Sequence, residues 1–510
     1  MKKLVIVLAA VAAGSGAATA ADLAAKTYVK APALAPSANW TGFYVFGGAG
    51  GGLWNADSNA VTSPGGLALT RDQRLGGTGW FGTVGLGYDW QVTPTWVAGV
   101  FADGQFGDIH GSIADPARFT EGTEKLRTSY AAGVRLGTLV APNVLSYVNA
   151  GYSGSEWSGS TFMGLPPGGG GFATFTTLSF RRSGWFVGGG VENSLNIFGV
   201  AAPGWFMKTE YRSAYYDRAT LPETFTPAFG GAPTGNAATF KPWVQTVSTS
   251  LVYRFNDMGT AAAAGSPTHL YAKAPSLAAG PNWTGFHVFG GGGGGIWNAD
   301  SGVVNPPIGV VVRDQRLGGN GWFGTVGLGY DRQFNSTWVA GVFADAQFGN
   351  LKGSISDPNF IGRITEGQER LRTSYAAGVR LGYLVAPNVL SYVNAGYSGS
   401  DWSGASHSSL ENAIGLVDVV TTPSFHRNGW FVGGGVENSL NILGVSAPGW
   451  FMKTEYRSAF YDRVELPASF GPAFGGGPTG DVVTFKPWVQ TISTSLVYRF
   501  NSTSPVVAKY

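Results

Sequence analysis

The sequence of 510 residues contains no cysteine. This excludes a framework of disulfide bonds and the attachment of a lipid to an N-terminal cysteine. Charged residues make up only 12% of the chain and the net charge is +3, so bulk electrostatics provide no basis for binding nucleic acid. Beyond the N-terminal region there is no apolar run of about 18 residues, which excludes membrane-spanning helices.

The N-terminus has the pattern of a cleaved secretion signal. Lys2 and Lys3 precede an apolar run over residues 4–13, and small residues follow at positions 18–20. A membrane-spanning helix needs about 20 apolar residues, so this run is too short to serve as a membrane anchor. We therefore expect residues 1–20 to be removed on secretion.

Glycine and aromatic residues are abundant together. The chain has 80 glycines, 32 phenylalanines, 20 tyrosines and 17 tryptophans. Glycine alone at this level would indicate a flexible polar tract, but many aromatic side chains are typical of a strand-rich membrane protein, which places them at the two membrane interfaces.

The sequence contains the same unit twice. The segment that begins Asn-Trp-Thr-Gly-Phe at Asn39 reappears at Asn282, and the match continues to Phe255 and Phe500. Sixteen of the 17 tryptophans fall into matched pairs, and the remaining one, Trp90, corresponds to an arginine. A repeat of this length indicates a domain duplication, since the units of a solenoid run only about 20 to 50 residues.

This repeat predicts the domain organisation. Residues 257–281 are rich in Ala, Gly, Ser and Pro and are expected to link the two copies. The predicted parts are a signal peptide (1–20), a periplasmic leader (21–38), a first β-barrel (39–256), the linker (257–281), a second β-barrel (282–501) and a C-terminal tail (502–510).

Alternation of apolar and polar residues predicts eight strands in each copy, joined by short turns on one side and long loops on the other. This is the layout of an outer-membrane barrel. In the first copy the predicted strands cover residues 40–54, 79–91, 96–107, 126–140, 144–158, 179–191, 204–216 and 240–255, and the predicted long loops cover residues 55–78, 108–125, 159–178 and 217–239.

One face of these strands is apolar and is expected to contact lipid, since side chains in a strand point to opposite sides in turn. The aromatic members of this face should lie near the lipid headgroups. In three strands of the first copy it comprises Trp80, Val84, Leu86, Tyr88 and Trp90, then Trp205, Met207, Tyr211 and Tyr215, and then Trp243, Val247, Leu251, Tyr253 and Phe255.

The opposite face carries charged residues of both signs and is expected to point inward. The interior of an eight-stranded barrel is just wide enough to be filled by side chains, so these charges should pair across it and plug it. This predicted polar network comprises Asp103, Arg135, Glu192, Lys208, Glu210, Arg212 and Arg254, and in the second copy Asp345, Arg380, Glu437, Lys453, Glu455, Arg457 and Arg499.

With its Tyr-x-Lys-Ala-Pro leader, its opening Asn-Trp-Thr-Gly-Phe strand and its closing Ser-Leu-Val-Tyr-Arg-Phe at residues 250–255 and 495–500, the chain resembles a known family. This is the family of small outer-membrane β-barrel proteins, labelled outer-membrane immunogenic or porin-family proteins and related in architecture to the OmpA-type membrane domain. The resemblance implies a surface protein, often an antigen, in the outer membrane of a Gram-negative bacterium. Members usually have one barrel and end at the terminal Phe, whereas this chain has two copies and continues to Tyr510.

No motif in the sequence indicates an enzyme, a cofactor or a metal. The five histidines have no histidine at the matching position of the other copy, which argues against a shared metal or catalytic site. The glycine clusters at residues 47–52 and 290–295 lack the Lys-Ser/Thr of a phosphate loop and are interpreted as closely packed strands. We expect no catalytic, metal-binding or cofactor-binding residues.

The motif Arg-Asp-Gln-Arg occurs once in each copy, before the second strand on the long-loop side. Arginine side chains suit phosphate groups, so Arg71, Arg74, Arg313 and Arg316 are candidates for contact with lipopolysaccharide. The alternative is that they are solvated loop charges or pair within the loop. The other expected partners are outer-membrane lipid and the outer-membrane assembly machinery.

Two functions fit the sequence. In the first, the copies are two closed, side-chain-filled barrels of a structural or surface-interaction protein. In the second, they join edge to edge as one 16-stranded barrel and form a porin-type passive diffusion channel. The separate leaders and closing signals favour two barrels.

Overall fold

The computed structural model describes residues 39–164, 173–197, 200–255, 282–360, 363–410, 418–442 and 445–500. These residues form antiparallel strands, together with the short 3₁₀ helices η1 (Pro116–Arg118), η2 (Pro227–Phe229) and η4 (Pro472–Phe474). The all-β class is therefore confirmed. The predicted signal peptide, leader, linker and tail lie outside the described residues.

In this part of the chain, no helix has the length and apolar character needed to cross a membrane.

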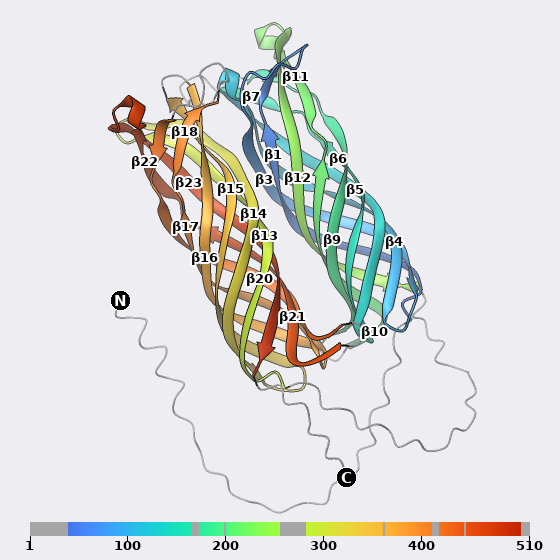
Figure 1. Cartoon of the computed structure of the whole chain (residues 1–510). Coiled ribbons are helices and arrows are strands. Elements are labelled where there is room, and N and C mark those ends of the chain that lie inside the picture. The colour runs from blue at the N-terminus through green and yellow to red at the C-terminus, as the bar shows by residue number, and fades with distance from the viewer. Residues whose placement is uncertain are drawn as a thin grey trace, which may run out of the picture. The chain divides into compact units, whose positions relative to one another are not determined.

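Eight long strands of the first copy pair in a cycle, here named the first ring (blue to green in Figure 1). Successive pairings run from β1 through β3, β4, β5, β6, β9 and β10 to β12, and β12 pairs back with β1. The strands are β1 (Gly42–Ser58), β3 (Gln73–Gln91), β4 (Trp96–Asp115), β5 (Thr120–Ala141), β6 (Val144–Trp157), β9 (Phe180–Ile197), β10 (Val200–Tyr216) and β12 (Pro233–Arg254).

The second copy repeats this cycle as the second ring (yellow to red in Figure 1). Its strands are β13 (Gly285–Asn305), β14 (Gly309–Gln333), β15 (Trp338–Phe360), β16 (Arg363–Ala386), β17 (Val389–Trp402), β20 (Phe425–Ile442), β21 (Val445–Tyr461) and β23 (Pro478–Arg499). A single pairing of Leu75 on β3 with Leu317 on β14 connects the two cycles into one 23-stranded sheet.

The two faces of the strands differ as the alternation predicts. In β3 the side chains of Trp80, Val84 and Leu86 are 57–69% exposed, whereas Phe81 is buried. The outward-facing aromatic residues, some exposed and some half-buried, gather in two belts, as expected at the two interfaces of a membrane. The loop-side belt contains Trp80, Trp185, Tyr215 and Trp243, and the turn-side belt contains Phe43, Tyr88, Trp90, Trp205, Tyr253 and Phe255.

On the short-turn side the predicted strand ends agree with the structure to within two residues, except that β9 extends to Ile197 and β10 begins at Val200. On the long-loop side the predicted ends at 158, 179 and 216 agree, whereas those of β1, β3, β4, β5 and β12 are wrong because these strands are longer. Strand β4 continues to Asp115 and β5 already begins at Thr120, so most of the predicted loop 108–125 is strand. The other predicted loops also contain strand residues. The additional short strands are β2 (Ala60–Thr62), β7 (Thr161–Gly164), β8 (Ala173–Thr176) and β11 (Ala219–Phe225) in the first copy, and β18 (Ala405–Ser409), β19 (Asp418–Thr422) and β22 (Val464–Phe470) in the second.

An aromatic core explains why the strands continue beyond the membrane. Trp54, Trp157 and Phe240 lie inside the loop-side end of the first ring, with ring centroids 5.1–5.7 Å apart and edge-to-face packing. All three are buried to within 1%. Burial of each such side chain contributes about 1.5–3 kcal/mol, which stabilises strand pairing outside the lipid. Trp297, Trp402 and Phe485 repeat the arrangement in the second ring.

The glycine clusters lie in the first strand of each ring, where neighbouring backbones approach closely. A Cβ atom at Gly48 would lie 2.1 Å from the carbonyl oxygen of Thr249 on β12, and a Cβ at Gly291 would lie 2.1 Å from that of Thr494 on β23. Only glycine fits at these inward positions, which agrees with the interpretation of the clusters as closely packed strand.

Candidate functional site in the ring interior

The predicted inward residues of the first ring lie in two ionic clusters. The turn-side cluster consists of Asp89, Arg135, Glu192 and Arg254, and the mid-ring cluster consists of Asp103, Lys208, Glu210 and Arg212. The strands β3, β4, β5, β9, β10 and β12 contribute these side chains because their alternation points every second residue into the ring. Each cluster contains two cations and two carboxylates, so each is neutral.

In the turn-side cluster, two arginines alternate with two carboxylates. Arg135 donates from Nε to Asp89 Oδ1 (2.8 Å) and from Nη1 to Glu192 Oε2 (3.0 Å). Arg254 donates from Nε to Glu192 Oε1 (2.8 Å) and from Nη2 to Asp89 Oδ2 (2.8 Å). Each arginine thus bridges both carboxylates, and all four side chains are buried.

The mid-ring cluster is an ion-pair chain across the ring. Arg212 forms a two-point pair with Asp103 and also donates to Glu210 Oε1 (2.9 Å). Lys208 Nζ lies 3.6 Å from Glu210 Oε2. The same oxygen accepts a hydrogen bond from the hydroxyl group of Tyr147 (2.8 Å). Such a network is stable in a buried site because each charge has a partner of opposite sign and several hydrogen bonds.

The second ring reproduces both clusters. The Arg457–Asp345 pair has distances of 2.8 and 2.5 Å, and Arg457 donates to Glu455 at 2.9 Å. Lys453 Nζ lies 3.5 Å from Glu455. At the turn side, Arg380 and Arg499 both pair with Asp331 and Glu437. All fourteen predicted network residues are therefore placed in one of four clusters.

Aromatic rings fill the remaining interior and contact the cations. Lys208 Nζ lies 3.3 Å from the centre of the Phe46 ring, and Lys453 Nζ lies 3.4 Å from that of Phe289. The guanidinium of Arg254 lies 4.4 Å from the Trp40 ring. These contacts bring packing and cation–π attraction to charges that lie away from water.

Sequence reasoning missed two pairs of residues in these clusters. Asp89 and Asp331 are fully buried and accept from both turn-side arginines of their rings. The signal was present, because Asp89 alternates with the lipid-facing Tyr88 and Trp90. Tyr147 and Tyr392, which donate to Glu210 and Glu455, were missed because a tyrosine is equally common on the lipid face.

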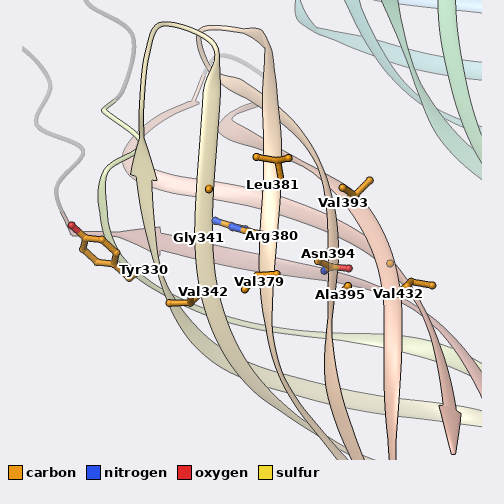
Figure 2. Close-up of a pocket in the computed structure, with 12 residues that line it drawn as sticks. Tyr330, Gly341, Val342, Val379, Arg380, Leu381, Val393, Asn394, Ala395 and Val432 are labelled. Carbon is orange, nitrogen blue, oxygen red and sulfur yellow. The ribbon is translucent and has the colours of Figure 1, made fainter. Parts of the chain in front are cut away.

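Among the buried polar side chains without a hydrogen bond, one equivalent pair of asparagines lies in the two ring interiors. Neither side-chain atom of Asn149 or Asn394 is hydrogen-bonded, although each side chain is only 4% exposed. Asn394 lies beside a hollow of about 790 Å³ on β14–β17 and β20, drawn in Figure 2. The exposed apolar side chains of Val342, Val379, Leu381 and Val393 line its outer part.

The four motif arginines contact protein groups. Arg74 pairs with Asp57, with Nε 2.7 Å from Oδ1, and Arg316 pairs with Asp300 at the same distance. Arg71 donates from Nη2 to Ser408 Oγ (2.8 Å) and from Nη2 to the carbonyl oxygen of Ser409 (2.8 Å). Arg313 donates from Nη2 to the carbonyl oxygen of Gly164 (2.5 Å). Their contact with lipopolysaccharide stays a prediction.

The histidines occupy unrelated environments. His287 is buried at the position of Tyr44 and its Nδ1 lies 3.5 Å from Asp331, while His407 is buried in β18. His110 and His426 each lie beside an exposed aspartate, and His269 lies outside the described residues. In the described ranges no three His, Cys, Asp or Glu side chains are grouped so as to hold a metal ion.

Buried carboxyl groups also occur beyond the loop-side belt. On β4, Asp108 is the strand partner of Trp80, which belongs to that belt. Ala114, six residues further along β4, is the strand partner of Glu121. Glu121 therefore lies beyond the belt, on the loop side. Burial raises the pKa of Glu121 to about 7, although a hydrogen bond from Ser112 partly lowers it. Burial likewise raises the pKa of Glu366, the equivalent residue in the second ring, to about 7.

A further pair of carboxyl groups at this end is present only in the first ring. Burial, followed by the nearby charge of Asp115, raises the pKa of Glu223 to about 9. Arg118 Nε lies 3.7 Å from Asp115 and 3.9 Å from Glu223, so one cation faces both carboxyl groups. The second copy has Ala468 at the position of Glu223.

The sequence is similar to a known protein family and to individual outer-membrane proteins. Residues 6–255 match the family described as the outer membrane protein beta-barrel domain. The 31 kDa outer-membrane immunogenic proteins of Brucella melitensis biotype 1 and Brucella suis biovar 1 are each 27% identical over 213 residues, which is 40% of this chain and 84% of the relative.

The solved structures that the chain matches include a Pseudomonas aeruginosa FadL homologue, with 12% identity, a TM-score of 0.26 and 90% of both chains covered. Neisserial surface protein A has 14% identity and a TM-score of 0.22, with 42% of this chain and 98% of that chain covered.

Antiparallel strands with an apolar outer face, two aromatic belts and a polar interior define the class of integral outer-membrane proteins. With the family match, residues 6–255 belong to the outer membrane protein beta-barrel domain family. The chain is an outer-membrane β-barrel protein of a Gram-negative bacterium, related to the outer-membrane immunogenic proteins.

Proposed function

We propose that the chain is a structural and surface-interaction protein of the outer membrane, whose two rings are separate eight-stranded barrels closed by their own side chains. The observation that carries this proposal is the pair of neutral ionic clusters in each ring. A porin lumen keeps its charges in water, whereas Arg135, Glu192 and Arg254 are at most 3% exposed. The proposed role involves no catalytic step.

The energetics of buried charges support closure. Taking an ion out of water costs several kcal/mol, and only well-formed pairs with additional hydrogen bonds offset this cost. In the turn-side cluster each arginine contacts both carboxylates, so water is not needed to satisfy these groups. Solutes would have to break these contacts to pass, and the proposed barrels therefore do not conduct.

Electrical recording of the purified full-length protein in planar bilayers tests the proposal. We expect no stable large conductance from the native chain. A variant should conduct when serine replaces the charged residues of both clusters of the first ring, because nothing ionic then closes that ring; these residues are Asp89, Asp103, Arg135, Glu192, Lys208, Glu210, Arg212 and Arg254. Arg181→Ser, whose side chain is 78% exposed, is the matched control and should stay silent.

The alternative function is passive diffusion through a single 16-stranded barrel. The β3–β14 pairing at Leu75 and Leu317 favours it, because this pairing joins the sheets of the two copies. Large, voltage-tolerant channels formed by the native protein would support this alternative and would refute closed barrels.

Outer-membrane lipid, lipopolysaccharide and the assembly machinery are the proposed partners. For lipopolysaccharide, replacing Arg71, Arg74, Arg313 and Arg316 with alanine should reduce its co-purification with the protein. Unchanged co-purification would refute the proposed contact with lipopolysaccharide. These arginines would then have only the protein contacts described above.

A further inference from the structure

Contacts between the two rings repeat when the two copies are exchanged. Asn55 of β1 donates from Nδ2 to the carbonyl oxygen of Gly319 on β14 (2.9 Å). Its equivalent, Asn298 of β13, donates from Nδ2 to the carbonyl oxygen of Gly77 on β3 (2.7 Å). Both bonds are buried, and the residues that take part are equivalent in the two copies. The same surface patch thus contributes to both sides of the contact.

A second reciprocal pair of bonds lies next to the first. The backbone N–H of Arg74 donates to Ser354 Oγ (2.8 Å), and that of Arg316 donates to Ser112 Oγ (2.8 Å). Each serine hydroxyl in turn donates to a half-buried carboxyl group of its own ring. Ser354 donates to Glu366 Oε1 (2.5 Å) and Ser112 donates to Glu121 Oε1.

The backbones of the two rings approach closely at the centre of this contact. Leu75 and Leu317 are ladder partners and both are fully buried. Beside them, a Cβ atom at Gly76 would lie 2.3 Å from Asn298 Oδ1. A Cβ at Gly318 would lie 2.2 Å from Asn55 Oδ1. Glycine at these two equivalent positions therefore permits the approach.

We propose that this surface is a self-complementary interface, and that its occupant is the equivalent surface of the other copy in the same chain. The chain is thus a covalently joined dimer of two like units, which associate through β3 and β14 without needing the linker. An interface of this kind uses one patch on both partners, as in a two-fold dimer. The inference goes beyond the proposed function, because it concerns how the rings associate and not whether they conduct.

The charges at the contact fit this occupant. Arg74 and Arg316 are each neutralised within their own ring, by Asp57 and Asp300, so they bring no unpaired cation to the interface. The groups that cross it are amides, hydroxyls and backbone atoms, together with the guanidinium groups of Arg71, Arg74 and Arg313, which donate to Ser408 and Ser409, to Asn320 and to Gly164 of the other ring. The patch accepts a copy of itself because its amide-to-carbonyl and backbone-to-hydroxyl hydrogen bonds occur in both directions.

Cysteine cross-linking tests the contact directly, because the native chain has no cysteine. In Leu75→Cys/Leu317→Cys, mild oxidation of the full-length protein in the membrane should give one bond within each chain. The control is Leu86→Cys/Leu328→Cys, on the same two strands, whose native side chains are 57% and 58% exposed. No bond in the first pair, or a bond that joins two chains and doubles the mass, would overturn the proposal.

Cleavage of the linker gives an independent test. With a protease site inserted into residues 257–281 of the full-length protein, the two halves should remain together after folding and cleavage. Gly76→Val/Gly318→Val should at least halve the fraction that stays together. Gly47→Val/Gly290→Val is the matched control, since a Cβ at either position meets no atom closer than 3.7 Å.

Halves of the native chain that separate on cleavage would overturn the proposal, as would equal retention in the two double variants. A variant that fails to fold is recognised by its unchanged mobility on gels with and without heating. The cysteine test then decides, because it does not depend on the valine variants.

Discussion

Arg212 and Asp103 form a two-point ion pair inside the first ring, with Nη1 2.8 Å from Oδ1 and Nη2 2.5 Å from Oδ2. Their side chains are 7% and 1% exposed. Arg457 and Asp345 repeat the pair in the second ring. Because the strands β4 and β10 are not neighbours in the pairing order, this ion pair spans the ring and ties opposite parts of its wall together.

Removing one partner of this pair should strongly destabilise the first ring. We expect Arg212→Met to lower the free energy of unfolding by about 3–5 kcal/mol, because Asp103 is left as an uncompensated buried charge. Denaturant unfolding of the protein in lipid vesicles, followed by tryptophan fluorescence, measures the change. Arg181→Met should cost at most about 1 kcal/mol, since the Arg181–Glu156 pair is exposed to solvent. Equal effects of the two substitutions would contradict the prediction.

Loss of the Tyr147 hydroxyl should lower the free energy of unfolding more than loss of the Tyr152 hydroxyl. Tyr147 donates to the buried carboxylate of Glu210 at 2.8 Å, and a hydrogen bond to a charged group contributes about 1.5–3 kcal/mol. Tyr147→Phe should therefore lower the free energy of unfolding by this amount. Tyr152 lies 3.0 Å from Ser183 but is 47% exposed, so Tyr152→Phe serves as the control, with almost no change. A loss in the control as large as in Tyr147→Phe would show that the hydroxyl itself is not the cause.

A charge introduced at Leu86 should destabilise the protein, whereas the same charge at Leu67 should not. Leu86, which is 57% exposed, lies between the aromatic belts, whereas Leu67 is 69% exposed in the loop before β3. We expect Leu86→Arg to lower the free energy of unfolding by about 2–4 kcal/mol in a lipid bilayer, because a cation near the membrane centre is poorly solvated. Leu67→Arg should have no measurable effect. Urea unfolding in vesicles compares the two, and tolerance of Leu86→Arg would argue that this face does not contact lipid.

Stability should fall as the pH rises from 5 to 8. Burial raises the pKa values of Glu121 and Glu366 to about 7 from an ordinary value of 4.5. Between these values the folded protein binds more protons than the unfolded chain, so the free energy of unfolding decreases as the pH rises through this window. For these two groups the decrease is complete by about pH 8, where both states are deprotonated, and Glu223, whose pKa burial raises to about 9, continues the decrease at higher pH.

Unfolding of Glu121→Gln/Glu366→Gln at pH 5 and pH 8 tests this assignment. The double variant should lose part of the pH dependence. The remainder should persist, because burial also raises the pKa of Glu124 to about 7. Glu465→Gln, at an exposed position on β22, is the control and should keep the native pH profile. An unchanged profile in the double variant would contradict the role of the two interface carboxyl groups.

Strand alternation alone determined which residues point inward. It predicted Arg135, Lys208 and Arg457 on the inward face, where the structure places them as buried side chains, because the period of two holds throughout each long strand and the other copy carries the same residue. It also located most turn-side ends of the strands, but not those of β9 and β10, which extend into the predicted turn. The same rule applies to Asp89, which was not predicted. In β3 the aromatic residues of the outward face dominate the pattern, and Asp89 is a single carboxylate between Tyr88 and Trp90.

The tertiary structure alone decided which inward charges meet. Partners such as Arg212 and Asp103 come from strands 109 positions apart in sequence, and their contact depends on how the ring closes. It also decided the length of the strands beyond the membrane. Alternation is weak there, and pairing is stabilised by Trp54, Trp157 and Phe240, which approach only when the ring is formed.

The motif arginines illustrate the same division between sequence and structure. The sequence determined that Arg74 and Arg316 are equivalent and lie on the long-loop side. Their pairing with Asp57 and Asp300, and the bonds of their backbones to serines of the other ring, depend on the approach of two distant strands. A pattern within one strand records which way a side chain points, whereas its partner is set by the closure of the sheet and the contact of the two rings.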